Sequence, residues 1–288
     1  MLNQDHKFED ARKDLDEDIS GFCKAKIFKM GRFIRLYSEL MRHFNVNFNE
    51  DLLEEISELD ENFEQRIKNF LIEWDYFLNE FENRVSIKND SCLELDQYFP
   101  DQVITEKIFS KIALKNSNEF NLITLDELHS DFRQQKLLNS DIKKLQRKAV
   151  EFIGLNCQVV LVSFGESKGA YRWLKENQIT NSNQFDMITD QERHLYKLFG
   201  LPNSYSKVWN SETLVYYAEQ LIKIGKLPGA YEDIEDDPHQ MGGNFIMEFN
   251  DINTNGNSKF KLVYAYKSKN PPDRPSAVAL LNFLKSKF

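Results

Sequence analysis

The chain has 288 residues, of which 41% are hydrophobic and 29% are charged, and its formal net charge is −9. This composition is typical of a globular protein with a sizeable core and excludes a disordered or fibrous chain. No apolar run reaches the roughly 20 residues that a membrane-spanning helix needs. Nucleic-acid binding is also disfavoured, because the chain is acidic and has no basic stripe interleaved with aromatic residues.

The acidic excess is confined to the first part of the chain. Residues 1–115 hold 25 acidic and 16 basic side chains, whereas residues 116–288 hold 21 of each. We therefore expect two units, 1–90 and 119–288, joined by a connector at 91–118. The N-terminus lacks a basic segment followed by an apolar one, so we expect no secretory signal and a cytoplasmic location.

The first unit is predicted to be an α-helical hairpin. Apolar residues recur every three or four positions in the stretches 24–45 and 50–82, which indicates two helices with coiled-coil-like seams. The seam residues are Ile27, Met30, Ile34, Tyr37, Met41 and Phe44, followed by Phe63, Ile67, Phe70, Trp74, Phe77 and Phe81. A short loop between the helices, with Asn49 as an N-cap, predicts that they fold back on each other. The bulky second seam calls for a further helix or a second copy of the chain, so self-association or a protein partner is expected at 24–45 and 50–82.

The first of these helices is basic, and this allows two interpretations. Its bases are Lys24, Lys26, Lys29, Arg32, Arg35 and Arg42, against the single acid Glu39. A basic amphipathic helix can lie on an anionic membrane. Alternatively, the bases pair with the acids of the second helix, which are Glu54, Glu55, Glu58, Asp60, Glu61 and Glu64. We favour pairing, because charge runs usually form a solvated face, and we expect no membrane partner.

From about residue 120 the pattern alternates between strands and helices. The predicted strands are 120–125, 157–164, 185–188, 244–249 and 260–266. The predicted helices are 133–153, 168–177, 191–199, 213–224 and 276–286, with Ser211 and Ser276 as caps and Gly200 and Gly225 as C-terminal ends. This order predicts an α/β fold, a thioredoxin-like sheet with flanking helices, preceded by the α-helical hairpin.

Several ordered motifs carry a resemblance to a known family. They are VVLVSFGESKGAYRWLKE (159–176), DQERHLYKLFGL (190–201), DDPHQMGG (236–243) and YKSKNPPDRPS (266–276). Together they resemble the alkyl hydroperoxide reductase/thiol-specific antioxidant (AhpC/TSA) family, in the peroxiredoxin-like branch to which selenoprotein L is also related. The resemblance covers about 110–288. It implies a thioredoxin fold and reduction of peroxides or disulfides with a thiol reductant.

The resemblance also implies where the reactive thiol or selenol should lie. In such proteins it ends a sheet strand and opens the next helix, whose N-terminus stabilises the thiolate. Here that helix is expected near Phe132, in HSDFRQQK, which contains no cysteine. Compared with the family pattern, a strand and its active-site turn are missing between Asp131 and Phe132. Either the segment FNLITL (120–125) moves inward to fill the central place, or the sheet is weakened.

The loop before the fourth predicted strand departs from the family as well. Peroxiredoxins carry an arginine there that helps to activate the peroxide, and this chain has Gln240. Thioredoxins have a cis-proline in that loop, whereas this chain has Gly242 and Gly243. We therefore assign no catalytic, cofactor-binding or metal residue and expect a family member without its own redox site. The alternative is a non-catalytic interaction or scaffold protein that acts through the helical hairpin.

Other candidate residues have structural interpretations. Cys157 opens an apolar strand and is expected to be buried, while Cys23 and Cys92 stand alone. The five histidines lack ligand spacing, and the acidic loop 232–237 lacks the pattern of a calcium loop, so no metal is expected. Arg193 is expected to pair with nearby acids within its own helix, a packing role. Arg274 is expected to anchor the entry to the last helix, although the family resemblance leaves a role near the site open.

Overall fold

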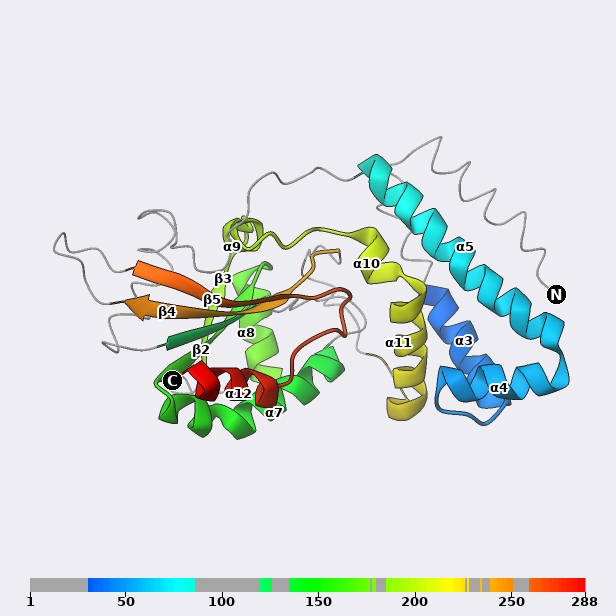
Figure 1. The fold of residues 1–288 in the computed structure, drawn as a ribbon, viewed down its shortest axis with the longest axis horizontal. Helices are drawn as coiled ribbons and strands as arrows, with labels where there is room; N and C mark the ends of the chain where they lie inside the picture. The colour runs from blue at the N-terminus through cyan, green and yellow to red at the C-terminus, as the bar shows by residue number, and fades with distance from the viewer. Residues whose placement is uncertain are drawn as a thin grey trace. The chain divides into compact units, whose positions relative to one another are not determined.

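A computed structural model describes residues 31–85, 120–125, 135–176, 178–179, 185–225, 227, 234, 239–250 and 259–287 (Figure 1). Its helices are α3 (Gly31–His43), α4 (Asn49–Leu59), α5 (Glu61–Val85), α7 (Gln135–Gly154), α8 (Ser167–Glu176), α9 (His194–Leu198), α10 (Tyr205–Trp209), α11 (Ser211–Ile224) and α12 (Ala277–Lys287). Its strands are β1 (Phe120–Leu125), β2 (Cys157–Ser163), β3 (Phe185–Thr189), β4 (Gly243–Asn250) and β5 (Lys259–Lys267). The predicted connector 91–118, the acidic side chains of the loop 232–237, the seam residues Ile27 and Met30, and Cys23 and Cys92 lie outside the described residues.

The chain folds as two compact units that are interleaved in sequence. The helical unit comprises α3, α4 and α5 together with α10 and α11, whereas the sheet unit comprises the remaining described elements. The predicted division assigned residues 204–227 to the second domain. In the structure these residues form part of the helical unit instead, because their apolar faces pack on the N-terminal helices.

The sheet unit has the predicted α/β fold, with strand order β3-β2-β1-β4-β5. β1 pairs in parallel with β2 and antiparallel with β4, so it occupies the central position. β3 extends the parallel side, and β5 forms an antiparallel pair with β4. Of the two alternatives left open by the sequence, the structure therefore shows the first. FNLITL fills the central place, and no gap remains between β2 and β4.

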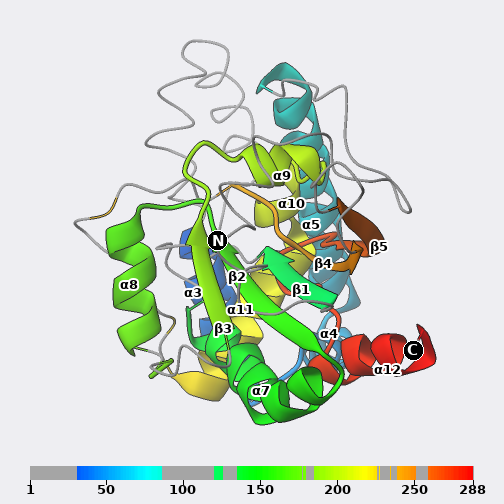
Figure 2. The same ribbon diagram turned by 90° about the vertical axis from the view of Figure 1, so that its left-hand side faces the viewer.

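Both faces of the sheet are covered, which explains the continuous apolar run of β2. On one face, Val160 and Val162 pack with Leu195, Tyr196 and Phe199 from α9 and the turn after it. On the other face, alternate β2 residues pack on helices α7, α8 and α12, in a cluster that includes Phe152, Cys157, Val159, Leu161, Trp173, Leu281 and Leu284. Figure 2 shows α9 and α7 on opposite sides of the sheet.

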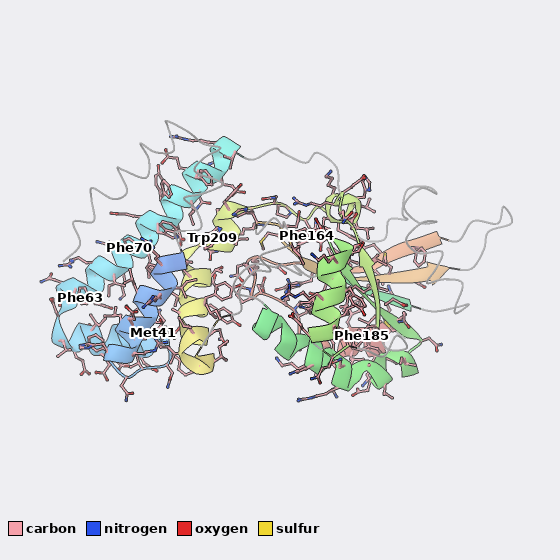
Figure 3. The ribbon with its side chains drawn as sticks, turned by 180° about the vertical axis from the view of Figure 1, so that it is seen from behind. Met41, Phe63, Phe70, Phe164, Phe185 and Trp209 are labelled. Atoms are coloured by element: carbon pink, nitrogen blue, oxygen red, sulfur yellow. The ribbon has the colours of Figure 1, made fainter. Side chains whose placement is uncertain are left out.

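The helical unit differs from the predicted hairpin in how its seams are covered. Ile34, Tyr37 and Met41 of the first seam are buried as expected, but α3 packs chiefly on α11. It meets α5 where the rings of Phe33 and Phe70 stack with centroids 5.7 Å apart. Of the two covers that the sequence left open, a further helix or a second copy of the chain, the structure shows further helices, since α10 and α11 pack on α5 and α3 (Figure 3).

The second predicted helix is divided at Asp60. The backbone of Asp60 is extended, with φ −157° and ψ 93°, and this conformation ends α4. Its carboxylate accepts a hydrogen bond from the amide of Phe63 at 3.1 Å, so the same residue caps the start of α5. The heptad spacing continues across the break, and periodicity alone therefore predicted one helix.

Of the bases in the predicted pairing, Lys24, Lys26 and Lys29 lie outside the described residues, and the ion pairs that the structure shows for these helices are intrahelical. Arg35 bonds Glu39, Lys68 bonds Glu64 and Arg84 bonds Glu80, each within its own helix. The ion pairs that the structure shows here thus follow the (i, i+4) pattern of a single helix rather than joining α3 to the acidic helices. Within the described parts of the chain, no helix combines the length and apolarity needed to cross a bilayer.

Candidate functional site

In a thioredoxin-type site the reactive residue ends a sheet strand and opens the next helix. The corresponding edge of this sheet is the one at which β1 ends. Leu125, the last residue of β1, lies in register with Val162 of β2 and Gly243 of β4. Gly243 in turn lies in register with Lys267 at the end of β5. The chain then passes through residues 126–134, which are outside the described residues, and enters α7 at Gln135. The sequence of this segment is DELHSDFRQ, which contains no cysteine.

Cys157, the cysteine that lies within the described residues, is at the opposite edge of the sheet. It is the first residue of β2, in register with Phe120 at the start of β1. Six residues at a rise of about 3.3 Å each separate it from Ser163, which is roughly 20 Å along the strand. Its side chain is 2% exposed and packs in the core beside α7 and α12. The expectation that this cysteine is buried is confirmed.

The loop that leads into β4 is fixed by Gln240. Its side chain is buried, and its amide nitrogen donates to the carbonyl oxygens of Leu201 at 3.3 Å, Pro202 at 3.2 Å and Met241 at 3.0 Å. The amide of Met241 adds a bond to Pro202 at 2.9 Å. The side chain of Gln240 therefore holds two loops together through a neutral amide.

Gly243 is the point of closest backbone approach at this edge. A Cβ atom placed there would lie 2.6 Å from the carbonyl oxygen of Tyr266 and 2.9 Å from the ring of Phe245. The glycine is therefore required by the packing of β4 against β5. The neighbouring Gly242 accepts a hydrogen bond from the amide of Ser268 at 3.1 Å, which continues the pairing one step past the strands.

The carboxylate of Asp190, which follows β3, is used to cap α9. It accepts hydrogen bonds from the amides of His194 at 2.9 Å and Leu195 at 2.7 Å. Arg193 has a left-handed backbone, with φ 58°, and its guanidinium lies 5.2 Å from the ring centroid of Phe164. The predicted helix from 191 therefore begins only at His194. The contact that the structure shows for Arg193 is thus a cation–π contact with Phe164, and the predicted pairing with acids of its own helix stays a prediction.

A second carboxylate at this edge orders the turn after β5. Asp273 accepts hydrogen bonds from the hydroxyl of Tyr266 at 2.5 Å and the amide of Lys269 at 2.8 Å. The bond to Asp273, with a smaller effect of burial, raises the pKa of Tyr266 to about 12. The phenol therefore stays protonated at neutral pH and cannot act as a base. The carboxylate of Asp273 therefore helps to fix this turn.

Two buried polar groups follow β5 at the same edge. The hydroxyl of Ser268 and the amide oxygen of Asn270 belong to side chains that are 3% and 6% exposed. Neither atom has a hydrogen-bond partner among the described residues. Buried polar atoms are normally satisfied, so these two mark the part of the edge that still has hydrogen-bonding capacity. Sequence patterns gave no sign of either residue, because a single Ser or Asn after a strand has no distinctive spacing.

Several side chains at this edge are already engaged in hydrogen bonds, and this limits the chemistry that they can perform. The side chains of Asp190, Gln240 and Asp273 hold the backbone in place, and Tyr266 is held protonated. The described residues include no cluster of three His, Cys, Asp or Glu side chains that could bind a metal ion. The described part of this edge is thus held by structural hydrogen bonds.

Comparison with known proteins agrees with this architecture. Residues 138–253, from α7 to the end of β4, match the family model described as AhpC/TSA antioxidant enzyme. This domain belongs to the AhpC/TSA family. The matched region of the AhpC/TSA domain includes α10 and α11, so these helices belong to the family segment by sequence although they pack in the helical unit. A comparison with curated proteins finds no match to the chain.

Proposed function

We propose that this AhpC/TSA protein does not itself carry out the thiol- or selenol-based reduction associated with its family. The observation that supports this proposal is the position of β1. It completes the centre of the sheet, and the turn that follows it, DELHSDFRQ, has no cysteine. The fold is thus complete without the segment that would bring a reactive thiol to the N-terminus of α7.

Physical chemistry supports the same conclusion for Cys157. The reactive form of a cysteine is the thiolate, which needs exposure and a nearby positive charge or a helix N-terminus. Cys157 is buried among apolar side chains at the far end of β2, and burial in such surroundings disfavours the charged form. A peroxide would also have to enter the closed core between α7 and α12 to reach it.

The test is peroxide consumption by the purified full chain with dithiothreitol as the reductant. We expect the rate to equal that of dithiothreitol alone, for the wild type and for variants with Cys23→Ser, Cys92→Ser or Cys157→Ser. A peroxide-consuming AhpC/TSA enzyme in the same assay is the positive control. Catalytic turnover that disappears in one of the three variants would overturn the proposal and identify the reactive thiol.

A second candidate function is a non-catalytic interaction protein that acts through the helical unit, with the sheet unit as its scaffold. It is favoured by the way in which the family segment contributes α10 and α11 to the N-terminal helices. Quantitative co-precipitation tests it. Partners of the wild type should be lost from a Trp74→Ala variant, which lacks the 2.7 Å bond to Trp209. Retention of every partner would contradict this role.

The predicted cytoplasmic location is part of the same proposal and is checked by cell fractionation.

A further inference from the structure

The helix α5 has two opposite faces of different character. Its inner face carries Phe77, Leu78 and Phe81, which are buried against the other helices of the unit. The opposite face carries a row of uncharged residues that we call the outer stripe. The outer stripe consists of Gln65, Asn69, Ile72, Tyr76, Asn79 and Asn83, all of which are exposed. Ile72 and Tyr76 at its centre are 67% and 66% exposed.

The spacing of the outer stripe is that of a coiled-coil seam. Its residues are separated by four, three, four, three and four positions, so they align along one side of the helix for nearly its whole length. Six successive seam positions contain no charge, although 29% of the chain is charged. Single exposed apolar residues need no explanation, but an Ile and a Tyr one turn apart within a continuous uncharged seam indicate a contact surface.

The charges beside the outer stripe identify what fits against it. On one side of the outer stripe, Arg66 lies in the first half of α5, Glu73 at its centre and Glu80 in the second half, where Glu80 also pairs with Arg84 of its own helix. A second α5 in the opposite direction would place Arg66 beside Glu80 of the other copy, and this would occur twice by symmetry. A parallel arrangement would set the acidic halves against each other.

The same antiparallel alignment matches the residues of the outer stripe. Ile72 meets Tyr76 of the other copy, so the apolar side chains come together at the centre. Asn69 then meets Asn79, and Gln65 meets Asn83, which allows amide hydrogen bonds to flank the apolar pair. The inner seam is already occupied by α4, α10 and α11, so among the described residues the outer stripe is the face of this helix that remains exposed.

We propose that two copies of this chain associate through antiparallel packing of the outer stripes of their α5 helices. This inference rests on the second proposed function, the interaction role of the helical unit, and names a second copy of the chain as the partner. It is independent of the proposal on redox chemistry, since self-association and peroxide consumption are measured separately.

Sedimentation equilibrium of the full chain tests the proposal, and the wild type should show a monomer–dimer equilibrium. Ile72→Glu places a charge at the centre of the outer stripe and should weaken dimerisation by about tenfold or more. The matched control is Val150→Glu on α7, where the native side chain is 72% exposed, and this variant should dimerise like the wild type. Circular dichroism checks that both variants keep their helical content. A wild type that stays monomeric, or an Ile72→Glu variant with unchanged affinity, overturns the proposal.

Exchange of the flanking charges tests the antiparallel direction. Arg66→Glu and Glu80→Arg, made singly, should each weaken the dimer because each creates two like-charge contacts. The double variant restores opposite charges across the interface and should recover most of the lost affinity. A double variant weaker than both single variants would overturn the antiparallel arrangement. If α5 is covered by another part of the same chain, the mass stays monomeric in every variant, which also overturns it.

Discussion

The carboxylate of Asp75 on α5 accepts two hydrogen bonds from Ser211, which lies 136 residues further along the chain. Its Oδ1 atom accepts from the Ser211 amide at 2.7 Å, and its Oδ2 atom accepts from the Ser211 hydroxyl at 2.5 Å. The amide of Ser211 is one of those that the first turn of α11 leaves without a helical partner. An acid of the N-terminal helices thus caps α11, a helix of the later segment 204–227 of the helical unit. Asn210, rather than the predicted Ser211, provides the local cap through its bond to Thr213.

Similar contacts join the two segments elsewhere in the helical unit. Glu82 accepts from the amide of Ser206 at 2.9 Å near the start of α10. In the reverse direction, Glu219 of α11 accepts from the amide of Asn49 at 3.0 Å at the start of α4. Each segment therefore supplies caps to helices of the other, in addition to the apolar contacts between them.

The first prediction concerns this reciprocal capping. Asp75→Ala should lower the free energy of unfolding by about 1–3 kcal/mol, because two donors of Ser211 lose their acceptor in a partly buried place. Chemical denaturation followed by circular dichroism measures the change. Glu73→Ala on the exposed side of the same helix is the control and should alter stability by less than about 0.5 kcal/mol. Equal effects from both variants would contradict the assigned role of Asp75.

A second prediction concerns the close approach at Gly243. Gly243→Ala should destabilise the sheet unit by about 1–3 kcal/mol, because the new Cβ atom would meet the Tyr266 carbonyl oxygen. The matched control is Gly154→Ala at the end of α7, where a Cβ atom would have no neighbour within 4 Å. That change should be neutral or slightly stabilising, since alanine favours helix. Thermal unfolding of the two variants beside the wild type distinguishes them.

A third prediction concerns the thiol of Cys157. Because its side chain is buried in the core, it should react with a thiol reagent only when the protein opens, so its labelling rate in native buffer should follow unfolding. A variant with Cys23→Ser and Cys92→Ser isolates this signal. Cys157→Ser should lower stability by about 1–3 kcal/mol, since it places a hydroxyl among apolar groups. Rapid labelling under native conditions would show that the thiol is accessible.

The fourth prediction is a dependence of stability on alkaline pH. The bond to Asp273 raises the pKa of Tyr266 from 10.0 in a model compound to about 12. The folded state therefore keeps a proton that the unfolded chain releases above pH 10. The stabilisation from this group is present below pH 10 and is lost as the pH rises towards 12. Tyr266→Phe should flatten this part of the stability curve. A variant curve parallel to that of the wild type would show that the Tyr266–Asp273 bond contributes nothing to it.

A fifth prediction concerns the cap of α9. Asp190→Ala removes the acceptor of three successive amides, those of His194, Leu195 and Tyr196, and should cost roughly 2 kcal/mol. Glu192→Ala two residues later is the control, because that side chain is exposed and should change little. Amide hydrogen exchange should localise the loss of protection to α9 in the Asp190 variant. Protection that falls evenly over the sheet unit would contradict a local capping role.

The sequence predicted the elements of the sheet unit well, because strand and helix periodicities are local signals. All five strands form where the apolar runs predicted them, and Gly200 and Gly225 have positive φ at the ends of α9 and α11. Ser276 accepts from the amide of Ala279 and caps α12 as expected. The central position of β1 could only be stated as one of two alternatives, since the choice of neighbouring strands depends on long-range hydrogen bonds.

The arrangement of the helical unit was harder to predict for a related reason. The apolar face of α11 has the same pattern whether it packs on the sheet or on α3, so periodicity does not reveal its partner. The break at Asp60 was also hidden, because the seam spacing continues across it, although an Asp before a new helical turn is a readable capping signal.

At the candidate site, the burial of Cys157 followed from its apolar strand. The hydrogen bonds of Gln240 and Asp273 required the fold.

The interleaving of the two units has a consequence for the growing chain on the ribosome. Glu82 is synthesised 124 residues before Ser206, its partner across the helical unit. At a synthesis rate of about 5–20 residues per second, roughly 6–25 s pass between the synthesis of α5 and that of α10, which with α11 covers its aromatic face. During that interval the nascent helices present Trp74, Phe77 and Phe81 without their final cover. The helical unit is therefore begun first, but it can be completed only after β1, β2 and β3 of the sheet unit have been made.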